Sequence, residues 1–168
     1  VFAVLLAEHG HEVTLACRDP EEARIIRETG RNPRYITDLD LSAVAAAPLV
    51  EAPIASAELV CLAVPSRAFR SVVEALPGSA PVLSLTKGLD PESGERLSRV
   101  VRGRPVAVLT GPNHAEEIAQ GLPAAAGSDA RASTARPIDT AAWNGVTHAR
   151  ASASRWWADT ATRPRAAT

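Results

Sequence analysis

Short apolar runs alternate with amphipathic segments along the first three quarters of the chain. Residues 12–17, 59–64, 81–86 and 105–109 are rich in Val, Leu and Ala and have the length of β-strands. The run at 59–64 is continuously apolar, which is typical of a parallel strand that is covered on both faces. Because strand-like and helix-like segments follow one another in turn, the pattern predicts a doubly wound parallel α/β sheet.

Punctuating residues mark where the helices begin and end. Residues 1–9 are predicted to end a helix, with Gly10 just beyond it. Asp19 and Pro20 predict the start of the next helix, with Asp19 as its N-cap. The remaining predicted elements are helices over 69–76, from Asp90 to 101 and over 113–120, and a short helix near 49–57 after an irregular stretch at 31–48.

The composition changes near residue 127. Of the last 42 residues, 28 are Ala, Thr, Arg or Ser, and Ile138 and Val146 are the only aliphatic residues larger than alanine. Such a segment cannot bury enough apolar surface to offset the entropy of ordering it. We therefore expect one domain at 1–126 and a low-order tail at 127–168. The Ala/Arg/Thr bias favours a message read out of frame, and a native disordered tail is the alternative.

Size, charge and cysteine content limit the classes of function. A chain of 168 residues suits one domain, and its net charge of −1 offers no electrostatic reason to expect binding of nucleic acid or anionic membrane. No apolar stretch reaches the ~18 residues of a membrane-spanning helix, so we expect no membrane insertion. Cys17 and Cys61 lie in apolar runs without metal-ligand spacing. They predict two buried, reduced thiols, no metal site and a cytoplasmic location.

Lys87 is the only lysine, whereas the other 17 of the 18 Lys and Arg residues are arginines. It follows the apolar run at 81–86, at the predicted carboxyl end of a strand. Ligands of open parallel sheets bind beyond these ends, and an ammonium there can meet an anion or a polarised oxygen. Loops containing Arg18, Ser66 and Gly111 should lie along the same edge. A solvated surface lysine is the ordinary alternative.

Five segments, in their order and spacing, resemble the bacterial NAD(P)-dependent glycerol-3-phosphate dehydrogenases. They are GHEVTLACRDPE, NPRY, LVCLAVPS, SLTKGLDPESG and VAVLTGPNHAEEIAQGLPAA, and they cover about residues 1–126. TKG followed by GPN-x-A-x-E is the most specific combination. The resemblance implies a Rossmann-like NAD(P)-binding domain and hydride transfer between NAD(P)H and dihydroxyacetone phosphate. The product, glycerol 3-phosphate, would serve glycerophospholipid synthesis, and the family allows a homo-oligomer.

The resemblance also assigns substrate contacts by position. Lys87 matches a family lysine that touches both the substrate and the nicotinamide region of the cofactor. Gly111 and Asn113 fall where the family contacts glycerol phosphate through backbone and side chain. We assign no catalytic residue, because the family's general-base lysine lies in a second, helical domain and no lysine follows Lys87.

On the cofactor side, the resemblance points to Arg18, Ser66 and Ala115. Arg18 follows the family's second strand, where an acidic residue reads the ribose of NAD or an arginine accepts the 2′-phosphate of NADP. Arginine there favours NADP, with NAD as the other cofactor. Ser66 has a rival role as the cap of the next helix, and Arg18 has one as a solvated surface residue.

The family pattern includes parts that we do not find in this chain. A first strand and a G-x-G-x-x-G phosphate loop should precede Val1, and the helical domain should follow about residue 126. We therefore expect an incomplete sheet and a chain that is inactive by itself. The alternatives are a non-catalytic pseudogene product, or a reductase of the ketopantoate or β-hydroxyacid type, which would not be expected to carry the TKG and GPN pairing.

Overall fold

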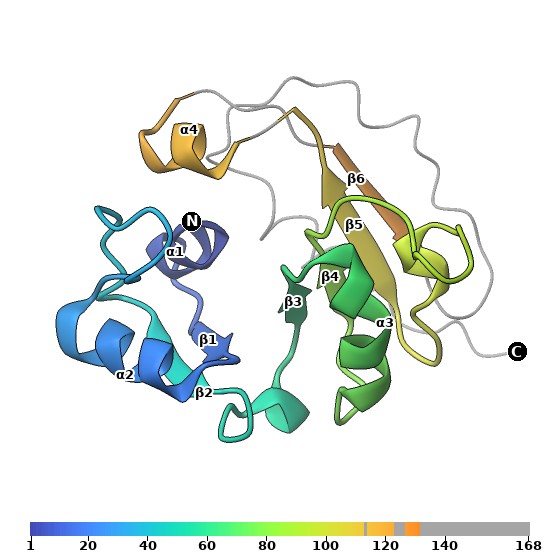
Figure 1. The fold of residues 1–168 in the computed structure, drawn as a ribbon, viewed down its shortest axis with the longest axis horizontal. Helices are drawn as coiled ribbons and strands as arrows, with labels where there is room; N and C mark the ends of the chain where they lie inside the picture. The colour runs from blue at the N-terminus through green and yellow to red at the C-terminus, as the bar shows by residue number, and fades with distance from the viewer. Residues whose placement is uncertain (113, 123–126, 132–168) are drawn as a thin grey trace, which may run out of the picture.

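The computed structural model describes residues 1–112, 114–122 and 127–131. Figure 1 shows short helices arranged around two groups of strands. The elements in chain order are α1 (Phe2–Glu8), β1 (Thr14–Cys17), α2 (Pro20–Thr29), β2 (Ala45–Pro48), the 3-10 helix η1 (Ile54–Ser56), β3 (Val60–Leu62), α3 (Ser66–Ala75), β4 (Val82–Ser84), the 3-10 helix η2 (Leu97–Arg99), β5 (Val106–Thr110), α4 (Ala115–Ala119) and β6 (Gly127–Arg131). Four predicted strands and the helices α1 to α4 therefore lie where the sequence pattern places them.

The strands pair in two sheets. β1 pairs in parallel with β2, while β3, β4 and β5 form a parallel set in that order, and β6 adds an antiparallel edge to β5. In Figure 1, α2 lies beside the first sheet and α3 beside the second. The predicted α/β architecture with parallel strands is confirmed. Within the described residues the strands do not join into one continuous sheet, since β1 and β3 are not paired.

Each sheet has its own hydrophobic core. The core of the first sheet contains Ile26 of α2 and Cys17 of β1, together with Ala23, Leu41 and Ala46. The core of the second is larger and is centred on Phe69 of α3, whose side chain is fully buried. Its other buried members are Leu62, Val73, Val82, Leu97, Val100, Val101 and Val106. Because Phe69 is locked in this core, the first turns of α3 are held firmly against the sheet.

Local chemistry explains both ends of α2. The Asp19 carboxylate accepts a hydrogen bond of 3.0 Å from the backbone N–H of Glu21, and Pro20 occupies the first turn, where no N–H is needed. Gly30 ends the helix in the left-handed region with φ of 65°. An added Cβ there would also lie 2.8 Å from the hydroxyl oxygen of Ser42, a side chain that can rotate away, so the left-handed conformation is what favours glycine. The predicted N-cap is confirmed.

The stretch at 31–48, predicted to be irregular, contains strand β2. Its sequence, Ala-Ala-Ala-Pro, has weak strand propensity, and its local pattern therefore gives no strand signal. Pairing with β1, in which Leu15 lies opposite Ala46, makes it a strand. The short helix predicted near 49–57 is reduced to the three residues of η1.

The helix predicted from Asp90 to residue 101 does not form, and only η2 is helical there. The Asp90 carboxylate accepts from the backbone N–H and the hydroxyl of Ser93, at 3.0 and 2.6 Å. Gly94 follows with φ of 68°, and its N–H donates to the Asp90 carbonyl oxygen. Asp90 therefore closes a turn instead of capping a long helix.

Strand β6 occupies the first residues of the segment predicted to be a low-order tail. Residues 127–131 pair antiparallel with β5, with Gly127 opposite Thr110. An edge strand can be held by backbone hydrogen bonds even when its sequence shows no alternation of apolar and polar residues. The composition therefore gives no signal for this strand. Residues 132–168, the rest of the predicted tail, lie outside the described part of the chain.

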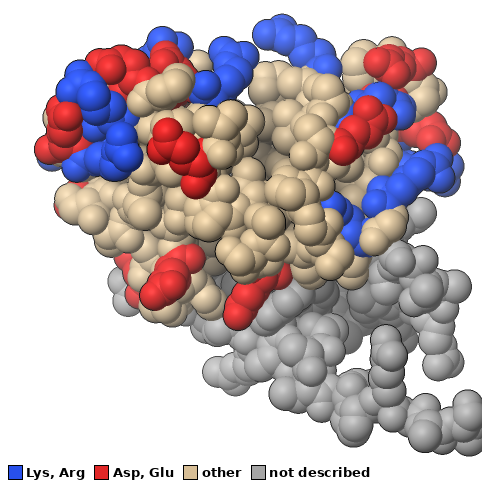
Figure 2. All heavy atoms as spheres, turned by 90° about the horizontal axis from the view of Figure 1, so that it is seen from below, with Lys and Arg blue, Asp and Glu red and all other residues tan. Residues whose placement is uncertain are grey.

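Figure 2 shows acidic and basic side chains interspersed on two sides of one face, with uncharged residues between them. On α2, Arg24 lies 2.6 Å from carboxylate oxygens of both Glu21 and Glu28. Among the described residues, no helix is long and apolar enough to cross a membrane.

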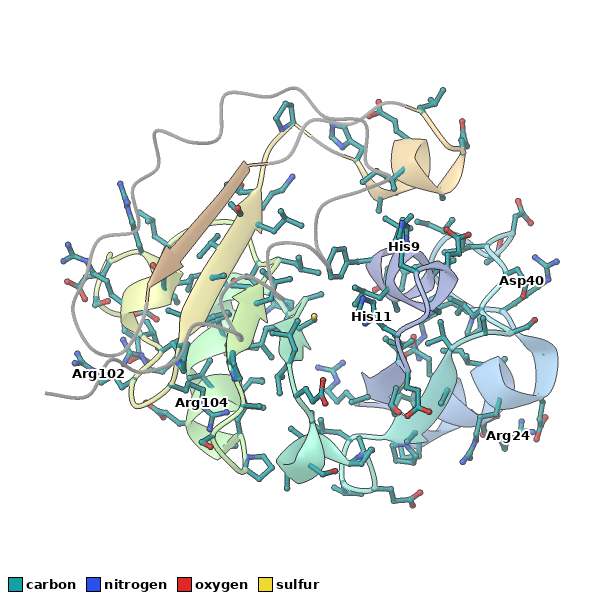
Figure 3. The ribbon with its side chains drawn as sticks, turned by 180° about the vertical axis from the view of Figure 1, so that it is seen from behind. His9, His11, Arg24, Asp40, Arg102 and Arg104 are labelled. Carbon is teal, nitrogen blue, oxygen red and sulfur yellow. The ribbon has the colours of Figure 1, made fainter. Side chains whose placement is uncertain are left out.

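Arg104 closes the turn between α3 and β4. Its guanidinium donates to the carbonyl oxygens of Leu76, Gly78 and Ala80, at 3.1, 2.7 and 3.3 Å. These carbonyls follow the end of α3, where backbone acceptors lack helical partners. Figure 3 shows Arg104 on the side of α3, with Arg102 further out.

Replacing Arg104 with alanine should lower the free energy of unfolding by about 1–3 kcal/mol. The substitution removes the charged donor shared by three carbonyls, and hydrogen bonds to charged groups carry about this much energy. Urea unfolding of the chain, followed by circular dichroism, measures the loss. Arg102→Ala is the matched control, because Arg102 is exposed and its removal should stay within about 0.5 kcal/mol of the parent. Equal losses for both variants would contradict the prediction.

Candidate functional site

The loops after β4 and β5 meet through Lys87 and Gly111. The two strands are parallel neighbours, with Ser84 opposite Val108, so their carboxyl ends lie at one edge. The Nζ atom of Lys87 donates to the Gly111 carbonyl oxygen at 3.3 Å. Lys87 is exposed, so its ammonium is held at the edge while it remains accessible to solvent. Two of the residues singled out in the sequence are thereby in direct contact.

Thr86 anchors this loop to the neighbouring strand. Its buried hydroxyl lies 2.9 Å from the Val64 carbonyl oxygen and accepts from the Val64 N–H at 3.3 Å. The Leu85 N–H also donates to the Leu62 carbonyl oxygen, at 2.9 Å. These bonds tie the residues before Lys87 to the carboxyl end of β3. Sequence reasoning missed Thr86, although a hydroxyl at the end of an apolar strand is a signal for such an anchor.

Ser66 lies against the residue that follows Lys87. Gly88 has φ of 110°, a conformation that favours glycine, and a Cβ at this position would lie 3.6 Å from Cβ and 3.7 Å from Oγ of Ser66. Ser66 is the first residue of α3, whereas Pro65 holds the N-cap position and forms no side-chain cap. The rival role of Ser66 as a helix cap is therefore wrong. Its hydroxyl lies beside the Lys87–Gly88 loop.

A buried carboxylate completes this side of the site. Asp90 is 1% exposed, and its Oδ2 accepts from Arg70 Nη2 of α3 at 2.5 Å. Arg70 Nε also lies 3.1 Å from the Glu92 carboxylate, which is exposed. The hydrogen bond from Arg70, aided by those from Ser93, lowers the pKa of Asp90 to about 2. Sequence reasoning assigned Asp90 to a helix start and missed Arg70.

The other predicted residues are not joined to this cluster. Arg18 is exposed and follows β1, in the first sheet, and no hydrogen bond or ion pair among the described residues links it to Ser66, Lys87 or Gly111. Its neighbour Asp19 is engaged with α2 and with Arg34. Ala115 is exposed as the first residue of α4, and Asn113 lies outside the described residues. The roles of these residues stay predictions.

The cysteines and acidic residues give no sign of a metal centre within the described ranges. No group of three or more His, Cys, Asp or Glu side chains gathers there. Cys17 and Cys61 are free, and Cys61 is half-buried rather than buried as predicted. Burial raises the pKa of the Cys61 thiol to about 11, which keeps it protonated at neutral pH.

Replacing Asp90 with asparagine should remove an acid-sensitive part of the stability. The native pKa of Asp90 is about 2, below its ordinary value of 3.8, so the folded state holds this proton less tightly than the unfolded state. The carboxylate therefore stabilises the fold above about pH 4, and this contribution is lost as the pH falls toward about 2. Urea unfolding of parent and variant at about pH 5 and pH 2.5 checks it. The stability difference should shrink at the lower pH, and a constant difference would contradict the assignment.

Comparison with known proteins identifies the family. A model of the N-terminus of NAD-dependent glycerol-3-phosphate dehydrogenase matches residues 1–135. This chain belongs to that family. The match runs past residue 126, and so extends into the segment predicted to be aberrant. The Lys87–Gly111 contact therefore joins two loops of a family domain, the TKG loop and the GPN loop.

Curated relatives and a solved structure agree with this assignment. The glycerol-3-phosphate dehydrogenase (NAD(P)+) of Nocardia farcinica is 42% identical over 139 residues, which cover 74% of this chain and 41% of that protein. The Moorella thermoacetica enzyme of the same name is 43% identical over 131 residues, covering 73% and 39%. The structure of glycerol-3-phosphate dehydrogenase from Coxiella burnetii aligns with a TM-score of 0.70 and 28% identity, over 78% of this chain and 43% of that one. The chain thus spans about two fifths of the length of these relatives.

Proposed function

We propose that this chain supplies the nicotinamide-binding part of an sn-glycerol-3-phosphate dehydrogenase. The enzyme would move hydride between NAD(P)H and dihydroxyacetone phosphate and provide glycerol 3-phosphate for glycerophospholipids. The observation that carries the proposal is the bond from Lys87 Nζ to the Gly111 carbonyl oxygen. It joins the TKG and GPN loops at the carboxyl ends of neighbouring parallel strands, where open α/β sheets bind their ligands.

At the substrate end, Lys87 would orient dihydroxyacetone phosphate. An ammonium is a compact charge that suits the oxygen atoms of a phosphate or a polarised carbonyl. The Gly111 carbonyl holds this ammonium at the edge of the sheet, which favours one position for the charge. The side-chain amide of Asn113 would add a neutral donor and acceptor. In this proposal no residue of the chain acts as the general base.

On the cofactor side, the residues present fit a dinucleotide in part. The Ser66 hydroxyl lies beside Gly88, which has no side chain, and this pairing suits close approach of a ribose. The nicotinamide ring would supply the hydride, and the chain would bind and orient it. Arg18 would accept the 2′-phosphate of NADP, with NAD as the weaker cofactor. Ala115 would allow close approach through its small side chain.

An exchange enzyme tests this function. We define it as the Nocardia farcinica relative in which the aligned segment is replaced by the corresponding part of this chain. Reduction of dihydroxyacetone phosphate by NADPH, followed by loss of reduced-nicotinamide absorbance, should reach a rate within about tenfold of the parent enzyme, that is, within about 1.4 kcal/mol of its activation barrier. The same exchange with the Moorella segment is the matched control.

The result separates this function from its alternatives. A folded but inactive exchange enzyme, beside an active Moorella control, would favour the non-catalytic alternative. Reduction of ketopantoate in place of dihydroxyacetone phosphate would favour the other reductase class. Cytoplasmic location and homo-oligomerisation belong to the same proposal, and size-exclusion chromatography with light scattering tests the second.

A further inference from the structure

The segment after Lys87 runs along one face of α3. Ser66 and Arg70 are four residues apart in the helix and therefore lie on the same face. Ser66 lies against Gly88, and Arg70 binds Asp90. Four helical residues rise about 6 Å. Two residues of chain span at most about 7 Å. The two contacts therefore match in spacing and set the segment parallel to the helix face.

We propose that Arg70 and Asp90 are a positioning pair that holds Lys87 in place for the reaction. The proposal concerns residues to which the resemblance assigned no role, and its catalytic consequence rests on the proposed function. Neither side chain needs to touch substrate or cofactor. Both act through the backbone of the loop that carries Lys87.

The Asp90 end of the loop is a firm anchor. Its buried carboxylate accepts from Arg70 and twice from Ser93, and its N–H donates to the Glu95 carbonyl oxygen at 2.9 Å. A buried carboxylate that loses its charged partner is strongly unfavourable, so the pair holds one arrangement of the loop. Arg70 directly follows the fully buried Phe69 in α3. The Arg70–Asp90 pair therefore fixes the loop relative to the hydrophobic core.

The Thr86 end is anchored independently. The Thr86 hydroxyl is bonded to Val64 at the end of β3, as described above. Lys87 therefore lies between two fixed points, Thr86 and Asp90. The intervening Gly88 has the conformational freedom of glycine, so release of the Asp90 anchor should let Lys87 sample other positions.

The exposed partners of Arg70 provide a matched control. Glu92 lies 3.1 Å from Nε and Glu74 lies 4.0 Å from Nη1, and both carboxylates are exposed. Exposed ion pairs on one arginine contribute little to order or stability. Glu92→Gln therefore perturbs the same guanidinium without releasing the loop. Comparing Glu92→Gln with Asp90→Asn therefore separates the effect of losing the buried Arg70–Asp90 pair from the effect of removing any negative charge beside Arg70.

The composition of the chain allows a direct measurement on Lys87. Labelling the full chain with 15N-lysine and 15N-phenylalanine gives amide signals from the single lysine and from the 2 phenylalanines, one of which is Phe69. In the parent, Lys87 and Phe69 should both have order parameters of about 0.85, the value of rigid backbone. In Asp90→Asn, Lys87 should fall below about 0.6 while Phe69 stays unchanged. Glu92→Gln should leave both signals at their parent values.

Three results would overturn the positioning role. They are an unchanged Lys87 in a folded Asp90→Asn variant, an equal loss of order at Lys87 in Glu92→Gln, and a loss at Phe69 as large as that at Lys87. If Asp90→Asn does not fold, Arg70→Lys takes its place, and the Lys87 and Phe69 amide signals are measured in the same way. Lysine keeps the positive charge but lacks the planar guanidinium that binds Asp90. Its Lys87 signal is identified by comparison with the parent spectrum.

Activity of the exchange enzyme supplies the catalytic test. Asp90→Asn should lower kcat about tenfold with either cofactor and change the KM for NADPH less than twofold, since Arg18, Ser66 and Ala115, the other proposed cofactor contacts, are unchanged. A higher KM for NADPH with an unchanged kcat would contradict the positioning role. If the NMR result holds and the exchange enzyme is inactive beside an active Moorella control, the proposed function fails while the structural inference stands.

Discussion

Replacing Lys87 with alanine should lower kcat/KM for dihydroxyacetone phosphate about a hundredfold to a thousandfold in the exchange enzyme, with NADPH and NADH alike. The lysine brings the positive charge that is held at the carboxyl edge of β4 by the Gly111 carbonyl. Removal of one preorganised polar group from a reacting centre has an effect of this size. Both cofactors share the nicotinamide end, so the loss should not depend on the 2′-phosphate.

Steady-state rates with each cofactor, at varied dihydroxyacetone phosphate, measure this effect. Lys87→Arg keeps the charge in a different geometry and should recover only part of the rate. The substitution should not unfold the domain, because the Lys87 side chain is exposed. A loss confined to NADPH would contradict the placement of Lys87 at the substrate end.

Replacing Arg18 with alanine should reduce kcat/KM for NADPH about tenfold to a hundredfold and leave NADH almost unchanged. A charge-assisted bond to the 2′-phosphate contributes roughly 1.5–3 kcal/mol, which corresponds to this range of rates. Arg18 follows β1 and is exposed, so its side chain is free of the core. The prediction depends on position alone, since no contact links Arg18 to the Lys87 loop within the described residues.

The two matched controls for Arg18 differ in what they keep. Arg18→Lys retains a cation and should preserve most of the preference for NADPH. Arg27→Ala removes another exposed arginine, in the last turn of α2, and should affect neither cofactor. Equal losses for NADPH and NADH in Arg18→Ala would show that Arg18 supports the fold instead of reading the phosphate.

Local patterns in the sequence were sufficient for most of the secondary structure. Apolar runs predicted β3, β4 and β5, because parallel strands that are covered on both faces are rich in apolar side chains. Asp19 and Pro20 predicted the start of α2 through capping and backbone preferences that act within one turn. The position of Lys87 at a strand end also follows from the pattern alone.

Tertiary structure decided where polar groups find partners. Arg70 and Asp90 are 20 residues apart, and Lys87 and Gly111 are 24 apart, so packing of α3 and pairing of β4 with β5 bring them together. Strand β2 and strand β6 depend on the edges that β1 and β5 offer, and neither carries a strand pattern of its own. Apart from β2, β6 and the turn that begins at Asp90, the sequence by itself determined which residues form the strands and helices, since those preferences act over a few neighbours. The tertiary structure alone determined that Asp90 is buried beside Arg70, because a buried charge is stable only where the folded chain supplies its partner.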